Sequence, residues 1–329
     1  MKVTAIANAN IALIKYWGKK NSELKTPYNS NTSVTLDGLK TTTTVEFGDY
    51  EKDIFILDKQ EYFEGSGEYD TAKGQLDLIR EKSGEVKKAK VVSENDFPTA
   101  AGFASSASGL AALTFAAAKA ANLKATTKEL SVIARMGSGS ASRSLIDGFA
   151  VWHASEVSEE SFAEQIMPKE HWPKFRILGC VISKKAKKTK SRAGMKQSVV
   201  TSPIFEQWYT TAEKDAKKMI ELIKSKDFEG VGELAQSNCV LMHACAMTTK
   251  PTIMYWTQGT MQVIQKVLEL QNEGVKAYFT IDGGPQVKVI CLEEDVPKLK
   301  EILIGLEMVQ EIIECKPGTA PKTTKEHLF

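Results

Sequence analysis

Residues 98–109, PTAAGFASSASG, form an uncharged stretch of small residues that leads directly into the apolar segment LAALTFAAAKAANL. The composition from Ser108 to Asn122 predicts a helix that is buried on several faces. A helix N-terminus attracts anions through its unpaired N–H groups and its dipole, and small residues let a phosphate approach the backbone. The stretch therefore indicates a phosphate-binding loop, with tight packing of a small-residue helix start as the alternative.

This loop matches neither of the two common nucleotide-binding fingerprints. It lacks the G-K-[ST] ending of a Walker loop and the G-x-G-x-x-G spacing of a dinucleotide fold.

Two other segments also have residues suited to binding an anion. RMGSGSASRS, residues 135–144, carries Arg143, whose planar guanidinium fits a carboxylate or phosphate. SKKAKKTKSR, residues 183–192, is rich in cations without any acid, and is either solvated surface or a basic flap over a polyanion.

The segment NIALIKYWGKK supplies further polar groups at the end of an apolar strand. It brings Asn10, Lys15, Tyr16 and Lys19 close together in the chain. Lys15 follows four apolar residues, so it is either a partly desolvated and paired lysine or an ordinary lysine at a strand edge. Together with the preceding loops, the segment indicates an enzyme that binds several anions in one cleft, namely a nucleoside triphosphate and a phosphorylated acid.

Asp282 is the candidate base. It ends an apolar strand in YFTIDGGPQVKVI, where the glycines leave room for a hydroxyl beside it. The alternative is that Asp-Gly simply forms a hairpin turn between two strands. His243 lies in the apolar segment LMHACAM and is better explained as a packed core histidine than as a ligand.

Length and composition indicate an ordinary globular protein. The 329 residues are 42% hydrophobic and 26% charged, and the length suggests two lobes. A net charge of +2 is too small to give the protein an overall positive electrostatic field that would attract nucleic acid or acidic membranes. The first apolar run is too short and interrupted for a signal peptide or a membrane span, so we expect a cytoplasmic protein. The number of cysteines is odd and none has CxxC spacing, which predicts free buried thiols. The five cysteines are Cys180, Cys239, Cys245, Cys291 and Cys315.

Hydrophobic patterning predicts an α+β chain. Strands are expected within residues 2–17, 32–36, 40–57, 88–96, 148–154, 175–183 and 276–292. Helices are expected near residues 70–84, 108–122, 126–137, 203–224, 227–241, 258–273 and 295–304, with Thr126 or Thr127 as one N-cap. The element order predicts an N-terminal lobe, residues 1–183, and a split α+β lobe, residues 184–329. We expect the tail, residues 316–329, to be mobile.

Four blocks in one order resemble a known family. PTAAGFASSASG, NIALIKYWGK, GSGSASRS and IDGGPQVK are similar to the motifs of the mevalonate diphosphate decarboxylases, within the GHMP kinase superfamily. The resemblance extends from about residue 4 to residue 292. It implies a two-lobed α+β GHMP-kinase-like fold with a deep cleft, commonly as a homodimer. It also implies conversion of mevalonate 5-diphosphate and ATP, with Mg²⁺, to isopentenyl diphosphate, ADP, phosphate and CO₂.

The resemblance also implies a role for each motif residue. Asp282 would orient or deprotonate the C3 hydroxyl, Arg143 would hold the carboxylate and the C3 oxygen, and Lys15 would lie beside them. The residues implied at the substrate diphosphate are Tyr16, Trp17, Gly18, Lys19, Ser138, Gly139, Ser140, Ala141, Ser142, Ser191 and Arg192. The residues implied at ATP are Ala104, Ser105, Ser106 and Ser108 in the loop and Lys187 and Lys188 in the flap, with Ser106 at the β/γ-phosphates or the metal.

The sequence departs from the family pattern at three places. Gln286 replaces the usual asparagine, Asn31 and Thr32 alter the early NSS block, and Lys250–Pro251 replaces a Pro-Pro pair. These changes leave two sister activities open: a decarboxylase that acts on the monophosphate and yields isopentenyl phosphate, and a kinase that phosphorylates C3 without decarboxylation. A nucleic-acid-binding module is disfavoured by the neutral net charge and by the lack of aromatic residues in the basic run.

Overall fold

The computed structural model describes residues 1–97, 105–183 and 189–329. Its strands are β1 (Lys2–Ala12), β2 (Lys19–Asn21), β3 (Thr26–Pro27), β4 (Asn31–Gly48), β5 (Ile54–Leu57), β6 (Gln60–Tyr62), β7 (Lys88–Asn95), β8 (Phe149–Trp152), β9 (Ala163–Met167), β10 (Phe175–Val181), β11 (Tyr278–Ile281), β12 (Val287–Leu292), β13 (Glu311–Pro317) and β14 (Lys322–Thr324). Its helices are α1 (Gly67–Ser83), α2 (Ser105–Ala120), α3 (Thr127–Gly137), α4 (Ser191–Thr201), α5 (Phe205–Ser225), α6 (Phe228–Met247), α7 (Gln258–Asn272) and α8 (Val296–Ile304). Short 3₁₀ helices are η1 (Gly139–Leu145), η2 (Ser158–Glu160), η3 (Lys169–His171) and η4 (Glu293–Asp295).

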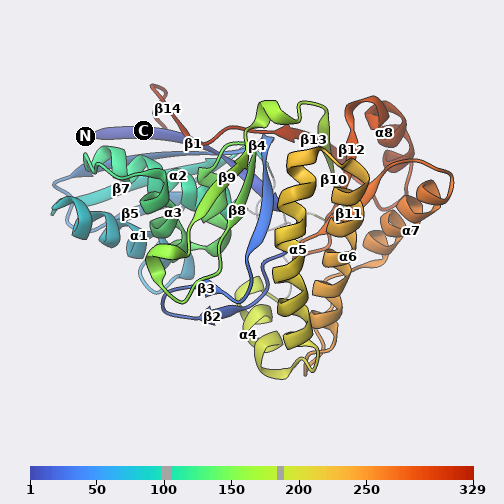
Figure 1. Cartoon of the computed structure of the whole chain (residues 1–329). Coiled ribbons are helices and arrows are strands. Elements are labelled where there is room, and N and C mark those ends of the chain that lie inside the picture. Colours follow the sequence, from blue (N-terminus) through green and yellow to red (C-terminus); the bar gives the residue numbers. More distant parts are fainter. Residues whose placement is uncertain (98–104, 184–188) are drawn as a thin grey trace.

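One mixed sheet runs through both halves of the chain (Figure 1). Its order is β11-β12-β10-β13-β4-β7-β5-β6, while β1 pairs with β4 and β14, and β8 pairs with β4 and β9. Strand β13 joins the halves, because it pairs with β10 and also places Lys316 opposite Asp37 on β4. The expected α+β class is confirmed.

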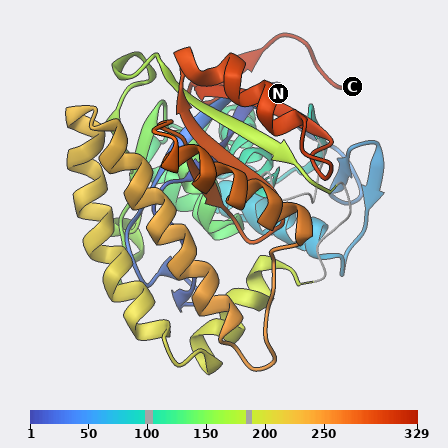
Figure 2. The same cartoon turned by 90° about the vertical axis from the view of Figure 1, so that its right-hand side faces the viewer.

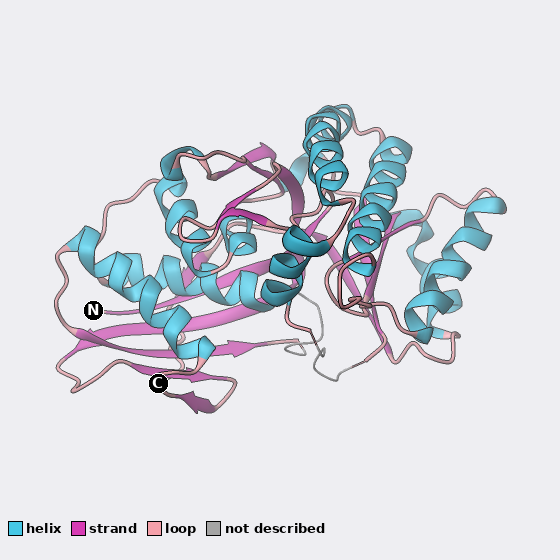
Figure 3. Cartoon of the chain, turned by 90° about the horizontal axis from the view of Figure 1, so that it is seen from below, coloured by secondary structure: helices cyan, strands magenta, loops and turns pink. Residues whose placement is uncertain are grey.

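Helices cover the sheet in each half (Figures 1 and 3). In the N-terminal half, Ala111, Ala112 and Ala116 of α2 are fully buried and pack in one core with residues of β1, β4, α1 and α3. In the C-terminal half, α5 and α6 lie side by side (Figure 2), and α7 and α8 share a core with β10–β12. The small side chains of α2 bring its backbone close to the strands.

Helix α3 leads directly into the Gly/Ser-rich turn at residues 138–142 and so positions it. The side chain of Thr126 accepts from the N–H of Glu129, whose carboxylate accepts from the N–H of Thr126, so Thr126 is the N-cap of a capping box. Beyond α3 the chain turns into η1. A Cβ at Gly139 would lie 2.6 Å from the Trp152 ring and 2.8 Å from the Tyr16 ring, so this close approach requires glycine.

The expectation of a mobile tail is wrong. Residues of β14 add an antiparallel strand to the edge of β1, and the termini lie side by side (Figure 1). His327 Nδ1 lies 2.7 Å from Thr4 Oγ1, and the Leu328 N–H donates to Thr44 Oγ1 at 3.0 Å. These partners are about 300 residues away in the chain, so no local pattern indicates them.

The five cysteines are free and buried, as expected. His243 is also buried, and its Nε2 donates to the carbonyl of Ile281 at 3.3 Å. Burial lowers the pKa of His243 to about 3, which makes it a neutral core residue. No helix in the described ranges is long and apolar enough to cross a bilayer.

Candidate active site

Lys15 and Asp282 form the centre of the site. Lys15 follows β1, and Asp282 begins the loop between the paired strands β11 and β12, so the expected hairpin is present. Lys15 Nζ donates to Asp282 Oδ1 at 2.8 Å and to the carbonyl of Ala12 at 2.9 Å. Lys15 is 2% exposed, whereas 26% of the Asp282 side chain remains accessible. The lysine of the pair is therefore enclosed by protein, whereas its carboxylate partner is still open to a ligand.

The backbone of Lys15 is held by two hydrogen bonds, one at its N–H and one at its carbonyl. Its N–H donates to Asn238 Oδ1 of α6 at 2.9 Å, and its carbonyl accepts from Asn29 Nδ2 at 3.0 Å. Asn238 is itself oriented by Asp215 of α5, which accepts from its amide at 2.9 Å. Elements from both halves of the chain thus fix the position of the lysine.

Arg143 is the second buried cation. It is 3% exposed, and its Nε donates to Asn10 Oδ1 at 3.2 Å while its Nη1 donates to Asn31 Oδ1. Both acceptors are neutral amides, and within the described residues no carboxylate lies at ion-pair distance from Arg143. Burial lowers the pKa of Arg143 to about 10, so the guanidinium stays charged at neutral pH. A buried charge with only amide partners favours binding of an anion.

The charge of Asp282 follows from opposing effects. Burial raises the pKa of its carboxyl, but the charges of Lys15, Lys288 and Arg143 and the hydrogen bond from Lys15 outweigh burial and hold the pKa below its usual value. Asp282 is therefore ionised at neutral pH. A carboxylate of low basicity is better suited to orienting a hydroxyl than to removing its proton before the bond to phosphorus forms.

Lys288 is a residue of this centre that the sequence does not predict. It lies on β12, is 3% exposed, and its charge lowers the pKa of Asp282. The signal in the sequence is a lysine within the apolar strand VKVICL. Because this strand is buried on both faces, the residue pattern alone does not show which neighbours the lysine has.

Tyr16, Trp17 and Gly18 follow Lys15 directly in the chain and differ in their surroundings. Tyr16 Oη is buried and has no hydrogen-bond partner in the described part of the chain, so it is available to a ligand. Trp17 has a packing role, since its Nε1 donates to Ser198 Oγ of α4 at 2.8 Å and its carbonyl accepts from Trp208 Nε1 at 3.0 Å. Gly18 has φ +115°, and a Cβ there would lie 2.6 Å from the Phe205 ring.

The turn at residues 138–142 divides into ligand candidates and packing residues. Ser138 and Ser140 are partly accessible, and their hydroxyls lie 3.2 Å apart. Ala141 is fully buried in the N-terminal core, and Ser142 Oγ donates to the carbonyl of Gly139 at 2.7 Å. Only Ser138 and Ser140 thus offer hydroxyls to a ligand.

Uncompensated cations gather beside this turn. Arg192, in the first turn of α4 and next to Ser191, donates to the carbonyl of Gly137 at 2.7 Å. Burial and the charge of Arg192 lower the pKa of Lys19 on β2. The cluster fits the expected diphosphate end of the site.

The described part of the loop expected to bind ATP has chemistry that suits phosphate and Mg²⁺. Ser105 and Ser106 lie in the first turn of α2, which contains no acidic residue, and Ser106 is exposed. Hydroxyl and backbone N–H groups suit phosphate oxygens and a magnesium ion carried by them. Ser108 instead has a structural role, since it is fully buried and accepts a hydrogen bond from Thr41 Oγ1 at 2.7 Å. Ala104, Lys187 and Lys188 lie outside the described residues.

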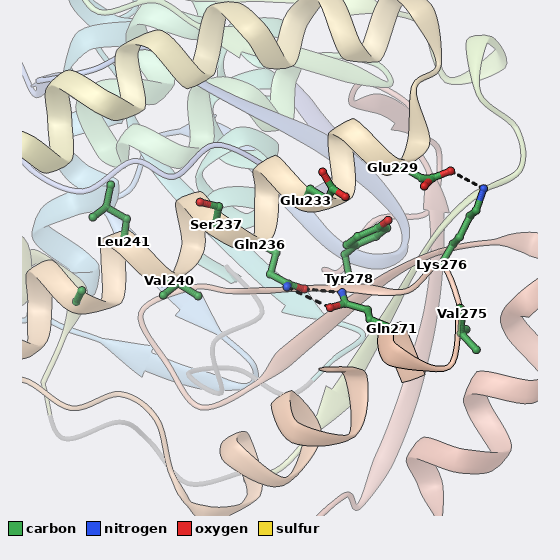
Figure 4. Close-up of a pocket in the computed structure, with 12 residues that line it drawn as sticks. Glu229, Glu233, Gln236, Ser237, Val240, Leu241, Gln271, Val275, Lys276 and Tyr278 are labelled. Atoms are coloured by element: carbon green, nitrogen blue, oxygen red, sulfur yellow. Dashed lines mark hydrogen bonds and ion pairs between the residues drawn. The ribbon is translucent and has the colours of Figure 1, made fainter. Parts of the chain in front are cut away.

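A separate hollow lies away from these residues. It is bounded by α6, the end of α7 and β11, and Glu229, Gln236, Lys276 and Tyr278 line it (Figure 4). Gln236 and Gln271 bond to each other, and Lys276 pairs with Glu229 at 2.5 Å. None of the residues predicted for the site lines this hollow.

The three departures from the family pattern have different surroundings. The Gln286 side chain is fully buried, accepts from the Ile182 N–H at 2.6 Å and donates to the carbonyl of Ser183. Asn31 supports Arg143, and Thr32 Oγ1 accepts from the Ile14 N–H at 3.3 Å. Lys250 is exposed. Gln286 therefore holds the chain just before the basic run.

We expect Gln286→Leu to lower the free energy of unfolding by about 1–3 kcal/mol, because the buried N–H of Ile182 loses its acceptor. Urea denaturation measures this difference. Gln310→Leu is the matched control, since Gln310 is exposed and donates to the carbonyl of the same Ile182 at 3.2 Å. Equal effects of the two substitutions would contradict the role given to Gln286.

Comparison with known proteins shows matches along nearly the whole chain. Residues 7–163 match the diphosphomevalonate decarboxylase-like N-terminal domain, and residues 177–325 match the mevalonate 5-diphosphate decarboxylase C-terminal domain. A diphosphomevalonate decarboxylase of Schizosaccharomyces pombe is 36% identical over 338 residues, covering 97% of this chain and 86% of that protein. The structure of the mevalonate diphosphate decarboxylase from Enterococcus faecalis has a TM-score of 0.91 at 39% identity, covering 99% of each chain. A structure of MDDEF with MVAPP, AMPPCP and magnesium has a TM-score of 0.92 at 39% identity, again covering 99% of each chain.

The fold is that of the GHMP-kinase-like α+β class, which confirms the expected fold. Within that class, the chain belongs to the mevalonate diphosphate decarboxylase family.

Proposed function

We propose that the protein converts mevalonate 5-diphosphate and ATP to isopentenyl diphosphate, ADP, phosphate and CO₂. The observation that carries this proposal is the convergence of Lys15, Asp282 and Arg143 in one buried, cationic centre. The ion pair of Lys15 with Asp282 and the amide-bound Arg143 supply an oriented carboxylate beside an anion-binding guanidinium. Family membership supports the same assignment.

The reaction needs a good leaving group at a tertiary carbon. Asp282 accepts a hydrogen bond from the C3 hydroxyl and orients its oxygen toward the γ-phosphorus of ATP; the proton passes to the carboxylate as the O–P bond forms and ADP leaves. Lys15 stabilises the charge that develops at this oxygen. Magnesium bound with ATP would neutralise charge on the phosphates. We assign the contact with it to Ser106, which is exposed in the first turn of α2.

Arg143 is suited to the second half of the reaction. Its guanidinium holds the C1 carboxylate near C3. The C3–O bond then breaks and phosphate leaves with the electron pair. The electrons of the C1–C2 bond form the C2=C3 double bond, and C1 departs as CO₂. The buried surroundings of Arg143 and Lys15 exclude water from the electron-deficient carbon.

Three further properties belong to this proposal. We propose two working lobes, residues 1–183 and 184–329, with the ligands between them. We also propose a homodimer, which light scattering of the purified protein tests directly. A cytoplasmic location agrees with the five free buried thiols.

The experiment is a comparison of mevalonate, its 5-phosphate and its 5-diphosphate as substrates, with ADP release measured in the presence of ATP and Mg²⁺. The proposal predicts the highest kcat/KM for the diphosphate. A preference for the monophosphate would assign the chain to the sister decarboxylase, and a preference for mevalonate would contradict the assignment of Lys19 and Arg192 to a diphosphate.

A further inference from the structure

Lys25 lies at the phosphate end of the site, although no motif includes it. It precedes β3, which pairs with β2 and so places Lys25 on the same hairpin as Lys19. The hairpin lies beside α4 (Figure 1). Lys25 Nζ donates to the carbonyl of Met136, and Arg192 donates to the next carbonyl, that of Gly137. Two cations from different elements thus meet at the end of α3, directly before Ser138.

The positive charge at this point is not balanced by the protein. Within the described ranges, no acidic side chain lies at ion-pair distance from Lys19, Lys25 or Arg192. The negative end of the α3 dipole attracts cations but carries only about half a charge. Burial, together with the charges of Arg192 and Lys19, lowers the pKa of Lys25 to about 8. The three cations repel each other, and an anion bound among them would relieve that repulsion.

The neighbouring Lys20 shows the opposite situation on the same hairpin. Its Nζ pairs with Glu156, and the hydrogen bond and charge of that partner raise the pKa of Lys20. Lys20 is an exposed lysine with an acidic partner, whereas Lys25 is half-buried, and among the described residues its Nζ bonds to a peptide carbonyl alone. Lys20 is therefore a surface lysine whose charge is already paired, whereas the charge of Lys25 is available to a bound anion.

We propose that Lys25 is a third cation of the substrate's phosphate subsite, acting with Lys19 and Arg192 to select a diphosphate over a monophosphate. The inference rests on the proposed function. A diphosphate carries more negative charge than a monophosphate and reaches farther from the reacting C3. A cation beyond the serine turn therefore stabilises the terminal phosphate of the diphosphate more than it stabilises the single phosphate of the monophosphate.

The test compares Lys25→Met with Lys25→Arg and with the matched control Lys20→Met. Lys25→Met is expected to raise KM for mevalonate 5-diphosphate roughly 5- to 20-fold, with a smaller rise for the 5-phosphate and little change in kcat. Lys25→Arg keeps the charge and should stay within about threefold of the wild type. Lys20→Met should leave both KM values unchanged.

A pH series gives a readout that a structural role would not produce. The charge of Lys25 is lost as pH rises through about 8, so KM for the diphosphate should rise between pH 7 and pH 9 in the wild type. The guanidinium of Lys25→Arg does not titrate there, so its KM should rise less. The other charged groups that act on Lys25 are Arg192 of α4 and Lys19 of β2, and both remain in every variant.

Calorimetric binding of inorganic pyrophosphate separates this inference from the proposed function. The wild type should bind pyrophosphate more tightly than phosphate, and Lys25→Met should lose most of that difference, whatever the enzyme turns over. Unchanged pyrophosphate affinity in Lys25→Met, or unchanged selectivity between the two mevalonate phosphates, would overturn the role of Lys25. A wild type that binds pyrophosphate through Lys25 but does not turn over the diphosphate would overturn the proposed function alone.

Discussion

Asp282→Asn is expected to lower kcat by roughly 100-fold or more, the scale of losing a positioned carboxylate that takes up a proton. The amide keeps the shape of the side chain, but it no longer carries the charge that pairs with Lys15 at 2.8 Å, and it accepts a proton poorly. Binding of an ATP analogue should be unchanged, because the described residues of the ATP loop lie on α2. Single-turnover measurement of ADP release, with equilibrium binding of the analogue, checks both expectations.

Asp227→Asn provides the control for Asp282→Asn. Asp227 is the N-cap of α6 and accepts from the Gly230 N–H at 3.0 Å, a role that asparagine fills equally well. The same chemical change there should leave kcat and stability unaltered. Near-normal turnover in Asp282→Asn would contradict the role given to that carboxylate.

Lys15→Met is expected to produce the second large effect, a fall in kcat/KM of roughly 100-fold or more, because an oriented charge at the reacting oxygen is lost. It should also lower the free energy of unfolding by about 1–3 kcal/mol, since the buried carboxylate loses its partner. The accessible quarter of the Asp282 side chain, together with Lys288 and Arg143, limits this loss. Steady-state kinetics and urea denaturation measure the two effects.

The pH dependence of stability gives the sign of the Lys15–Asp282 interaction. The folded pKa of Asp282 lies below its usual value of about 3.9, so the interaction stabilises the folded protein above about pH 4 and is lost as pH falls through the folded pKa. In Lys15→Met the pKa of Asp282 should rise, and the stability difference from the wild type should shrink on acidification.

Two further variants make the Lys15 prediction specific. Lys15→Met/Asp282→Asn should be less destabilised than the sum of the single changes, because no unpaired carboxylate remains. Lys40→Met removes a lysine that pairs with Asp37 at the surface and should cost less than about 0.5 kcal/mol. Strict additivity, or an unshifted acid profile in Lys15→Met, would contradict the account.

The sequence predicted the class of fold and the centre of the site, but with alternatives still open. The pattern at Asp282 suited a hairpin as well as a base, and the structure shows that the same loop is a hairpin and holds Lys15. The family resemblance, rather than spacing, connected Lys15, Arg143 and Asp282, which are far apart in the chain. The strands and α-helices missed from the sequence were β2, β3, β6, β9, α4, β13 and β14, which are short or follow polar runs without clear periodicity.

Membership in a sequence motif did not distinguish the residues that could contact a ligand from those that pack inside the protein. Trp17, Ala141 and Ser108 belong to the predicted blocks, yet the structure gives their side chains internal partners. Lys25 and Lys288 show the converse. Their importance depends on where the β2–β3 hairpin meets α3 and on which groups surround β12, and both are tertiary facts. The pKa of Asp282 is of the same kind, because it is the balance of burial against three nearby charges.

The most direct test of the central claim is the ratio of CO₂ to ADP released by the wild-type protein from mevalonate 5-diphosphate, ATP and Mg²⁺. We expect one CO₂ and one phosphate for each ADP, with isopentenyl diphosphate as the organic product. ADP release without CO₂ would show a kinase that stops at the phosphate ester, and it would contradict the roles proposed for Arg143 and Asp282 in driving the loss of the carboxylate.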